Sequence, residues 1–479
     1  MSHNNRPRLA ICTVALALCA LSQPITAQTG AAPQRFTAEQ LAERAVQRRA
    51  VEAVIWGMPA VNFERMVDGL VHAKGEWNQV VYWSRLPDWK NQTLTPNPDV
   101  IYLMPFYDTR NGPVVLEIPP AEGGSITGSV DEGWQTAIED VGPAGVDKGK
   151  GGKYLILPPG YKDKVPDGYI PMPSSTYAGF ALLRSNIGSG SDADIAKAAV
   201  YGRKVRIYPL AQAAIPPATR FVDAIDTVYD STIPYDLRFF EKLHRFVQRE
   251  PWIERDRAMI DALKSIGIEK GKPFAPDRKT QAILQDAVAE ARAWLDTTYE
   301  AGYVPYFSGS RWGIPVSPDV LDGMRSNFGK PDSYPVSGRG VLYTFGFFSA
   351  RHGGRGQAYL ATIKDKAGQA LDGGSTYRLT VPPNAPVRLY WSATAYDRAT
   401  HALIRDQKWS SRASTSQGLQ KNADGSVDVF FGPKAPQGKE MNWVPTQAGG
   451  RFEVLFRFYG PEKPLFDKTW QLPDIEKLQ

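Results

Sequence analysis

The sequence predicts a mainly β protein, in which two sandwich-like β segments accompany one helical unit. Short apolar runs broken by Pro, Gly and Asn fill residues 71–210 and return in residues 336–479. Apolar residues at helical spacing occupy much of residues 28–70 and 211–335. No repeated β–α–β rhythm is present, so a parallel sheet with crossover helices is not expected.

Residues 1–27 have the pattern of a signal peptide. Arg6 and Arg8 precede an uninterrupted apolar run from Leu9 to Leu21, and the small residue Ala27 ends the segment. The run is shorter than the roughly 20 residues that a membrane-spanning helix needs, which argues against the alternative of a membrane anchor. We therefore expect a periplasmic or secreted protein with no membrane span.

The composition excludes several classes of protein and of site. Of 479 residues, 42% are hydrophobic and 22% charged, which is typical of a folded chain. The formal net charge of +6 includes Arg6 and Arg8, and the remainder is too dilute to indicate a nucleic-acid groove. Both cysteines, Cys12 and Cys19, lie in the leader, so disulfides and thiolate metal sites are not expected beyond it. The remaining histidines lack metal-ligand spacing, which argues against an imidazole-rich metal site.

A helix is predicted to open the chain after the leader. Thr37 and Gln40 form a capping box, and apolar residues keep helical spacing as far as Met58. Pro59 is expected to end this helix. Because the apolar stripe cannot be buried alone, we expect residues 28–70 to pack with the helical residues 211–335 as one discontinuous domain.

The first β segment, residues 71–210, contains five predicted strands and one short helix. The helix is expected from about Asp192 to Tyr201, before Gly202. The strands are expected at Val114–Ile118, Ser125–Val130, Tyr154–Leu157, Tyr177–Arg184 and Val205–Tyr208.

The second β segment, residues 336–479, has its clearest strand near the end. From Arg451 to Tyr459, phenylalanines and a valine alternate with polar or charged residues, which indicates one face toward a core. A longer strand is predicted at Val387–Tyr396. Arg457 and Tyr459 lie on the face opposite the phenylalanines, where they could line a concave surface.

Several motifs resemble two families named as domains of unknown function. Thr95-Pro-Asn-Pro-Asp99 with Tyr102, Gly112–Pro119 and Gly152–Gly160 resemble the domain of unknown function 1254 family. Pro386–Asp397, Asn422–Ser426, Asn442–Pro445 and Arg457–Pro461 resemble its usual companion, the domain of unknown function 1214 family. The resemblance implies an immunoglobulin-like sandwich, a jelly-roll-like sandwich and helices beside them. It implies no particular reaction.

Acidic residues provide the first candidates for chemistry. Asp131 and Asp140, with Glu132 and Glu139 beside them, flank Trp134, and this group suits acid–base chemistry or a hard divalent cation held by oxygen ligands. We predict Asp131 and Asp140 as catalytic and Trp134 as ligand-binding. The alternative is that these acids are solvated surface residues.

A second candidate group lies between Pro96 and Pro105. We predict Asp99 and Tyr102 as catalytic and Asn97 as ligand-binding, because a rigid loop could present Asp99 to a pocket. The alternative is an Asx-type turn that only fixes the loop.

The remaining ligand-binding candidates are aromatic or basic. Aromatic residues gather near Trp83 and could contact a sugar face or an apolar ligand, although they could equally fill a core. Basic residues in a glycine-rich loop could meet a carboxylate or phosphate, or form only a flexible solvated loop. In the second β segment the candidates resemble signature positions of the domain of unknown function 1214 family. The alternative is that they form a structural cation–π network. These residues are Trp83, Lys148, Lys153, Trp391, Tyr396 and Arg457.

Two functional hypotheses follow. The first is an exported enzyme that uses carboxylate acid–base chemistry on a small-molecule or polymer substrate. The second is a non-catalytic periplasmic binding or envelope-associated module. Two carboxylates converging in a closed pocket would favour the enzyme, whereas an open aromatic strip with no perturbed acid would favour binding.

Overall fold

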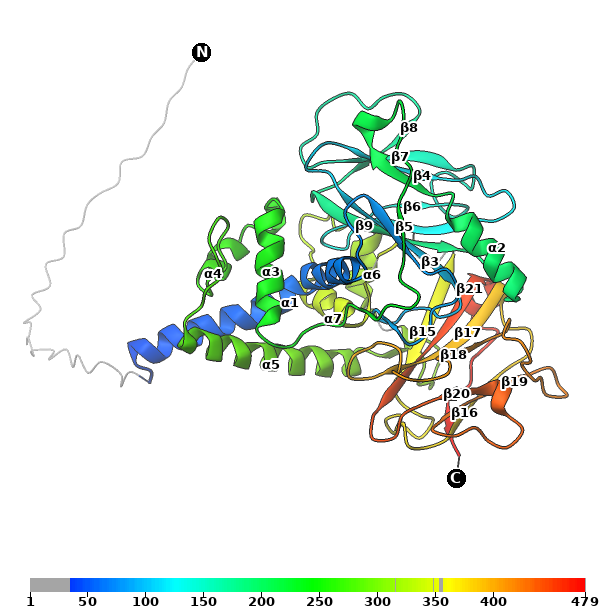
Figure 1. The fold of residues 1–479 in the computed structure, drawn as a ribbon. Coiled ribbons are helices and arrows are strands. Elements are labelled where there is room, and N and C mark those ends of the chain that lie inside the picture. Colours follow the sequence, from blue (N-terminus) through cyan, green and yellow to red (C-terminus); the bar gives the residue numbers. More distant parts are fainter. Residues whose placement is uncertain (1–34, 315, 348, 353–355, 479) are drawn as a thin grey trace, which may run out of the picture. The chain divides into compact units, whose positions relative to one another are not determined.

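The computed structural model describes residues 35–478, except 315, 348 and 353–355 (Figure 1). The chain divides into two compact units between Ala42 and Glu43. The predicted signal peptide lies outside the described residues. Within the described part, no helix has both the length and the apolar character needed to span a bilayer.

Helix α1 (Ala38–His72) begins at the predicted capping box. The Thr37 amide donates to Gln40 Oε1 over 2.9 Å and the Gln40 amide donates to Thr37 Oγ1 over 3.1 Å, which confirms that motif. The prediction that Pro59 ends the helix is wrong, because α1 continues for more than three further turns.

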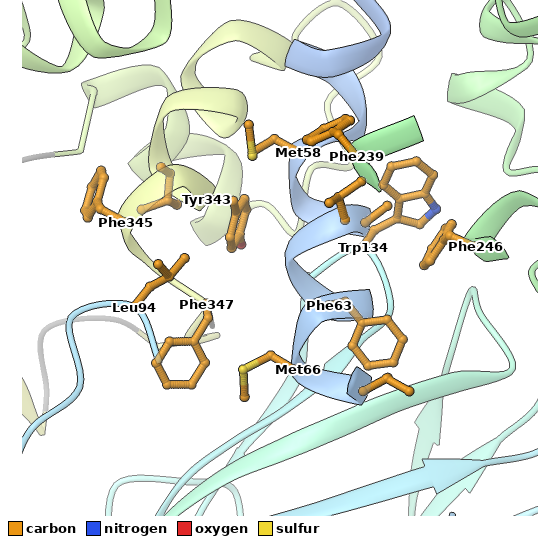
Figure 2. Close-up of a cluster of buried hydrophobic side chains, with 14 of the residues drawn as sticks. Met58, Phe63, Met66, Leu94, Trp134, Phe239, Phe246, Tyr343, Phe345 and Phe347 are labelled. Atoms are coloured by element: carbon orange, nitrogen blue, oxygen red, sulfur yellow. The ribbon is translucent and has the colours of Figure 1, made fainter. Parts of the chain in front are cut away.

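Burial explains why the helix passes through Pro59. A proline inside a helix costs about 3 kcal/mol, because it removes one backbone hydrogen bond and crowds the preceding turn. Residues 53–64 of α1 are nevertheless buried without interruption, and Figure 2 shows Met58, Phe63 and Met66 among aromatic side chains from other elements. Burying several large apolar side chains, at about 1.5–3 kcal/mol each, offsets the proline.

Two sheets form the first β body. A six-stranded sheet has the order β11-β1-β3-β9-β5-β6, and a four-stranded sheet has the order β10-β4-β7-β8. The strands of the first are Phe221–Asp223, Gln79–Tyr82, Ile101–Asp108, Ala178–Ser185, Ile126–Glu132 and Ala137–Val141. Those of the second are Arg206–Pro209, Val114–Ile118, Gly152–Leu157 and Tyr169–Pro173. The five strands predicted here are all confirmed, as is α2 (Asp192–Gly202).

The two faces of the six-stranded sheet have different neighbours. On β3, Leu103 and Tyr107 pack with the four-stranded sheet, whereas Tyr102, Met104 and Phe106 belong to the core that contains α1. The sheet is therefore buried on both sides. A short two-stranded sheet pairs β2 (Asn91–Gln92) with β12 (Tyr229–Asp230).

The helical part surrounds the portion of α1 that follows Ala42. Trp56 donates to Asp256 Oδ1 over 2.9 Å, and Glu64 forms ion pairs with Arg245 and Arg249. Helix α7 lies beyond the predicted boundary at residue 335, yet its Tyr343 belongs to the same core as α1. The helices are α3 (Arg238–Arg249), α4 (Met259–Lys264), α5 (Arg278–Ala301), α6 (Pro318–Arg325) and α7 (Val336–Phe345).

The second β body also pairs a six-stranded sheet with a four-stranded sheet. Their orders are β13-β14-β15-β21-β17-β18 and β20-β19-β16-β22. The first comprises Val304–Pro305, Gly313–Ile314, Gln357–Thr362, Phe452–Pro461, Val387–Asp397 and Ser411–Ala413. The second comprises Trp443–Pro445, Val427–Gly432, Tyr377–Val381 and Glu476–Lys477, and α8 is Lys463–Phe466.

The predicted alternation on the last long strand is confirmed. On β21, Phe452, Phe456 and Phe458 pack against the four-stranded sheet in one core, while Arg457 and Tyr459 lie on the opposite face. That face is also covered, because Arg457 and Tyr459 are buried and Tyr459 joins the core of α1. The outer faces of both six-stranded sheets thus contribute to one interior.

Candidate functional site

A cavity of about 470 Å³ lies between the outer faces of the two six-stranded sheets. Leu182 of β9 and Leu360 and Leu455 of the second body line it, as do Phe345 at the end of α7 and Phe347 after it. Figure 2 shows Leu94, another lining residue, near Phe347. The volume falls in the range of small-molecule sites, and the walls are mostly apolar, as such sites usually are.

The first β body places a tyrosine and an arginine on the cavity wall. Tyr102 of β3 and Arg184 of β9 are cross-strand partners, and the Arg184 Cζ lies 5.6 Å from the centroid of the Tyr102 ring. Both side chains are buried. The Tyr102 hydroxyl accepts the Asn97 amide over 2.8 Å, so its own proton remains to be donated.

The second β body repeats this arrangement. Arg457 of β21 and Tyr359 of β15 are cross-strand partners, with the Arg457 Cζ 5.6 Å from the centroid of the Tyr359 ring. Arg457 donates to Thr394 Oγ1 over 3.0 Å and to the Thr95 carbonyl over 2.8 Å. A guanidinium has five N–H groups, so these bonds do not exhaust it.

Phenols near the two arginines raise the pKa of both guanidinium groups. Burial alone would lower the pKa of Arg184, but the phenolic oxygens of Tyr359, Tyr459 and Tyr102 bring it above its usual value. Tyr396 raises the pKa of Arg457 most, and Tyr459, Tyr359 and Tyr102 add to that rise. Asn97 donates to the hydroxyls of both Tyr102 and Tyr459, so the two cross-strand pairs lie close together on the cavity wall.

Two predicted catalytic acids hold a segment of the cavity wall instead of lining it. Asp131 Oδ1 accepts the Ser349 amide over 3.0 Å, and the carboxylate of Asp140 accepts the Arg351 and His352 amides over 2.8 and 2.7 Å. Burial raises the pKa of Asp131 well above its usual range, and the charge of Asp140 adds to that rise. These two acids are thus close together, and their partners are backbone amides and, for Asp140, the Ser129 hydroxyl at 2.7 Å.

Asp99 also lies behind the wall. Its amide donates to Asn97 Oδ1 over 3.0 Å, which confirms the Asx-type turn. Its carboxylate accepts the Ser411 hydroxyl over 2.9 Å, and burial raises its pKa. Asn97 itself lines the cavity and donates through Nδ2 to the Tyr390 and Tyr459 hydroxyls over 3.0 and 2.7 Å.

The other predicted ligand-binding residues lie elsewhere. Trp83 and Trp134 are core residues, and the Trp134 ring contacts those of Trp56 and Phe246. Trp391 stacks on Phe456 between the sheets of the second body. Tyr396 is fully buried and donates to the Pro96 carbonyl over 2.6 Å.

The two predicted lysines are exposed on the first body. Lys148 has a φ of 51° in its glycine-rich loop. Lys153 is on β7, where its Nζ lies 3.8 Å from Glu117 Oε1 and 5.9 Å from the centroid of the Tyr169 ring. Neither lines the cavity.

Of the twelve predicted site residues, the cavity thus brings together Tyr102, Asn97 and Arg457. Sequence reasoning missed Arg184, Arg351 and Tyr359. Arg184 carried a signal, since it is the charged residue at the end of the apolar run in β9. No comparable signal marks Tyr359.

The described lining residues carry a one-sided charge. They include Arg184, Arg325, Arg351 and Arg457, and none of them is Asp, Glu, His or Lys. Nη1 of Arg351 is buried and has no hydrogen-bond partner among the described residues. Across the same described part of the chain, no three His, Cys, Asp or Glu side chains are grouped to hold a metal ion.

Comparisons with known proteins agree with the two-body architecture. Residues 77–209 match the sequence model of the family described as Protein of unknown function (DUF1254), and residues 356–463 match that of Protein of unknown function (DUF1214). The two matches follow one another along the chain in the order that the resemblance predicted. The DUF1254 match covers most of the first β body, and the DUF1214 match covers much of the second. No curated protein matches the chain.

Two solved structures have folds that align with most of this chain. The VPA0106 protein from Vibrio parahaemolyticus is 18% identical with a TM-score of 0.56, and the alignment covers 91% of this chain and 100% of that one. This likeness shows a shared fold. An uncharacterized protein from Burkholderia cenocepacia is 11% identical with a TM-score of 0.39, covering 92% of this chain and 96% of that one.

Proposed function

We propose that this protein is an exported binding protein that takes a small, largely apolar ligand into the cavity between its two β bodies. One observation carries the proposal: the cavity of about 470 Å³ has mostly apolar walls, and its described lining contains no side chain of the usual acid–base types Asp, Glu, His and Lys. Such a lining suits burial of a ligand better than proton transfer.

A dye titration tests this proposal. N-phenyl-1-naphthylamine is neutral and apolar, and its fluorescence rises when it leaves water. We expect saturable binding to the purified protein. Met324→Trp on α6 should weaken binding at least about tenfold, since Met324 lines the cavity and a larger ring would occupy ligand volume.

The matched control places the same side chain outside the cavity. Ile215→Trp should leave binding unchanged, because Ile215 is 88% exposed and does not line the cavity. Absence of saturable binding to the unmodified protein would contradict the proposal. Equal loss in both variants would also contradict it.

An exported enzyme is the second candidate, favoured by the raised pKa values of Asp99 and Asp131. Asp99→Asn tests it: an activity of the purified protein that this change abolishes, while dye binding is retained, would favour the enzyme. Metal analysis of the purified protein tests the expected divalent cation. The contacts of these acids with amides and a hydroxyl support a structural role instead.

Export and the finer fold classes belong to the same proposal. Arg6, Arg8 and the apolar run that follows them support cleavage after Ala27. Expression in a Gram-negative host should give a periplasmic product whose intact mass is that of a chain starting at Gln28. An uncleaved cytosolic product would contradict export. We assign the first body as immunoglobulin-like and the second as jelly-roll-like, supported by their face-to-face sheets.

A further inference from the structure

We propose that the ligand is an amphipathic monoanion, such as a fatty-acid-like carboxylate, whose head group is held by Arg184 and Arg457 with the Tyr102 and Tyr359 hydroxyls. This inference rests on the proposed function, since it names the class of ligand for the same cavity. The proposal requires that these four side chains recognise negative charge and that the other walls of the cavity bury an apolar tail.

The geometry of the polar end supports an anion. Each six-stranded sheet supplies one cross-strand Tyr–Arg pair, and all four side chains line the cavity. Guanidinium groups only donate hydrogen bonds, and a phenol can donate one. A carboxylate only accepts them, so it complements this set.

The surrounding charges favour the same conclusion. Burial raises the pKa values of Asp99 and Asp131, the acids that lie near Arg457 and Arg184 respectively, and so favours their neutral forms. Arg184 and Arg457 are buried, and none of the described lining residues is an acid. A bound anion would therefore lower the electrostatic cost of the buried guanidiniums.

Arg351 provides an independent observation. Its side chain lines the cavity, and its buried Nη1 has no hydrogen-bond partner among the described residues. Because Nη1 is shielded from water, Arg351 contributes positive charge beside the cavity without a direct contact to the ligand through this atom. Asp140 fixes the Arg351 backbone, so this third guanidinium is held beside the cavity.

The apolar walls account for the tail. Leu182, Leu342, Phe345, Leu360 and Leu455 line the cavity, and none of them offers a polar group to a ligand. Burying each methylene of a chain contributes about 0.8 kcal/mol, whereas a compact inorganic anion would gain nothing from these walls. A long-chain carboxylate uses both parts of the cavity.

The test compares three ligands with one chain length, decanoate, decanol and decylammonium, as competitors of N-phenyl-1-naphthylamine at neutral pH. We expect decanoate to bind at least about tenfold more tightly than decanol, because charge-assisted hydrogen bonds form only with the anion, and decylammonium to bind most weakly. Equal affinities for decanoate and decanol would show that the site does not select an anion, and would leave the proposed binding function standing. Failure of all three, and of the dye, would overturn the proposed function itself.

Two variants locate the head group. Arg457→Met should bring the decanoate-to-decanol ratio close to one, and Tyr359→Phe should reduce it about threefold or more, because a phenol donates a stronger hydrogen bond to a carboxylate than to a neutral hydroxyl. Arg457 also binds the Thr95 carbonyl, so its loss could prevent folding. In that case Tyr359→Phe tests the position of the head group. Tyr306→Phe is the matched control: Tyr306 lines the cavity, but its hydroxyl donates to the Leu465 carbonyl. An unchanged ratio in Tyr359→Phe, or an equal fall in Tyr306→Phe, would overturn the assignment.

Discussion

The Arg184 guanidinium lies over the ring of Tyr102, its cross-strand partner, with 5.6 Å between the Arg184 Cζ and the ring centroid. Tyr102 also accepts the Asn97 amide, and thereby ties the 95–99 loop to the sheet. One tyrosine thus organises both the charged end of the cavity and the loop beside it.

The hydroxyl of Tyr102 provides the first prediction. Tyr102→Phe keeps the ring under Arg184 but leaves the buried Asn97 amide without its acceptor, which costs about 1–3 kcal/mol. Urea unfolding should show this loss of stability. Tyr161→Phe, on the partly exposed surface of the first body, should change stability by less than about 0.5 kcal/mol, and an equal effect of both variants would refute the explanation.

The ion pairs of Glu64 give the second prediction. Glu64 is fully buried and pairs with Arg245 and Arg249, which link α3 to α1. Glu64→Gln should lower the free energy of unfolding by about 1–3 kcal/mol, because it weakens the hydrogen bonds of both arginines, which still pair with Asp68 and Glu250 respectively. Glu254→Gln breaks only an exposed pair with Arg257 and should cost less than about 1 kcal/mol. Thermal or urea unfolding of the two variants measures the contrast, and a loss below 1 kcal/mol in Glu64→Gln would count against the role of this pair.

The contact between α7 and α1 gives the third prediction. A Cβ on Gly340 would lie 2.8 Å from the Ile55 carbonyl oxygen, the acceptor left without its helical partner by Pro59. Gly340→Ala should therefore destabilise the protein by about 1–3 kcal/mol, although alanine favours a helix. Gly356→Ala meets no atom within 4 Å and should be nearly neutral in the same unfolding assay. A neutral or stabilising Gly340→Ala would show that the helices do not approach so closely.

The pKa of Asp131 gives a prediction with a defined sign. Burial raises it in the folded state, so the protonated form is favoured there and the stability contribution is complete below the unfolded value of about 3.9. That contribution falls as pH rises toward the folded pKa. Asp131→Asn should therefore gain stability relative to the unmodified protein between pH 4 and pH 8, measured by urea unfolding across that range. A stability difference that is constant with pH would contradict the raised pKa.

The sequence predicted five strands of the first body, because short apolar runs there end at Pro, Gly or Asn, but it missed the others, including β3. Val114–Ile118, for example, is β4 residue for residue. The predicted end of α1 was wrong, because local sequence patterns indicate the cost of Pro59 but not the burial that offsets this cost. Tertiary packing decided that boundary.

The candidate site was harder to predict for a related reason. Tyr102 and Arg457 were identified singly, but nothing in one sequence indicates that β3 and β21 face the same cavity. Asp131 and Asp140 have the composition of a catalytic pair, yet they bind amides of the 349–352 segment, which is more than 200 residues away. Their role depends on a long-range contact that spacing cannot reveal.

A crystal structure with 11-bromoundecanoate tests the central claim most directly, because anomalous scattering locates the bromine independently of the carboxylate. The account predicts one bromine peak among the apolar side chains of the cavity, with the carboxylate oxygens about 2.7–2.9 Å from guanidinium nitrogens of Arg184 or Arg457. An empty cavity at saturating ligand, or a carboxylate at the apolar end with bromine beside the arginines, would contradict it.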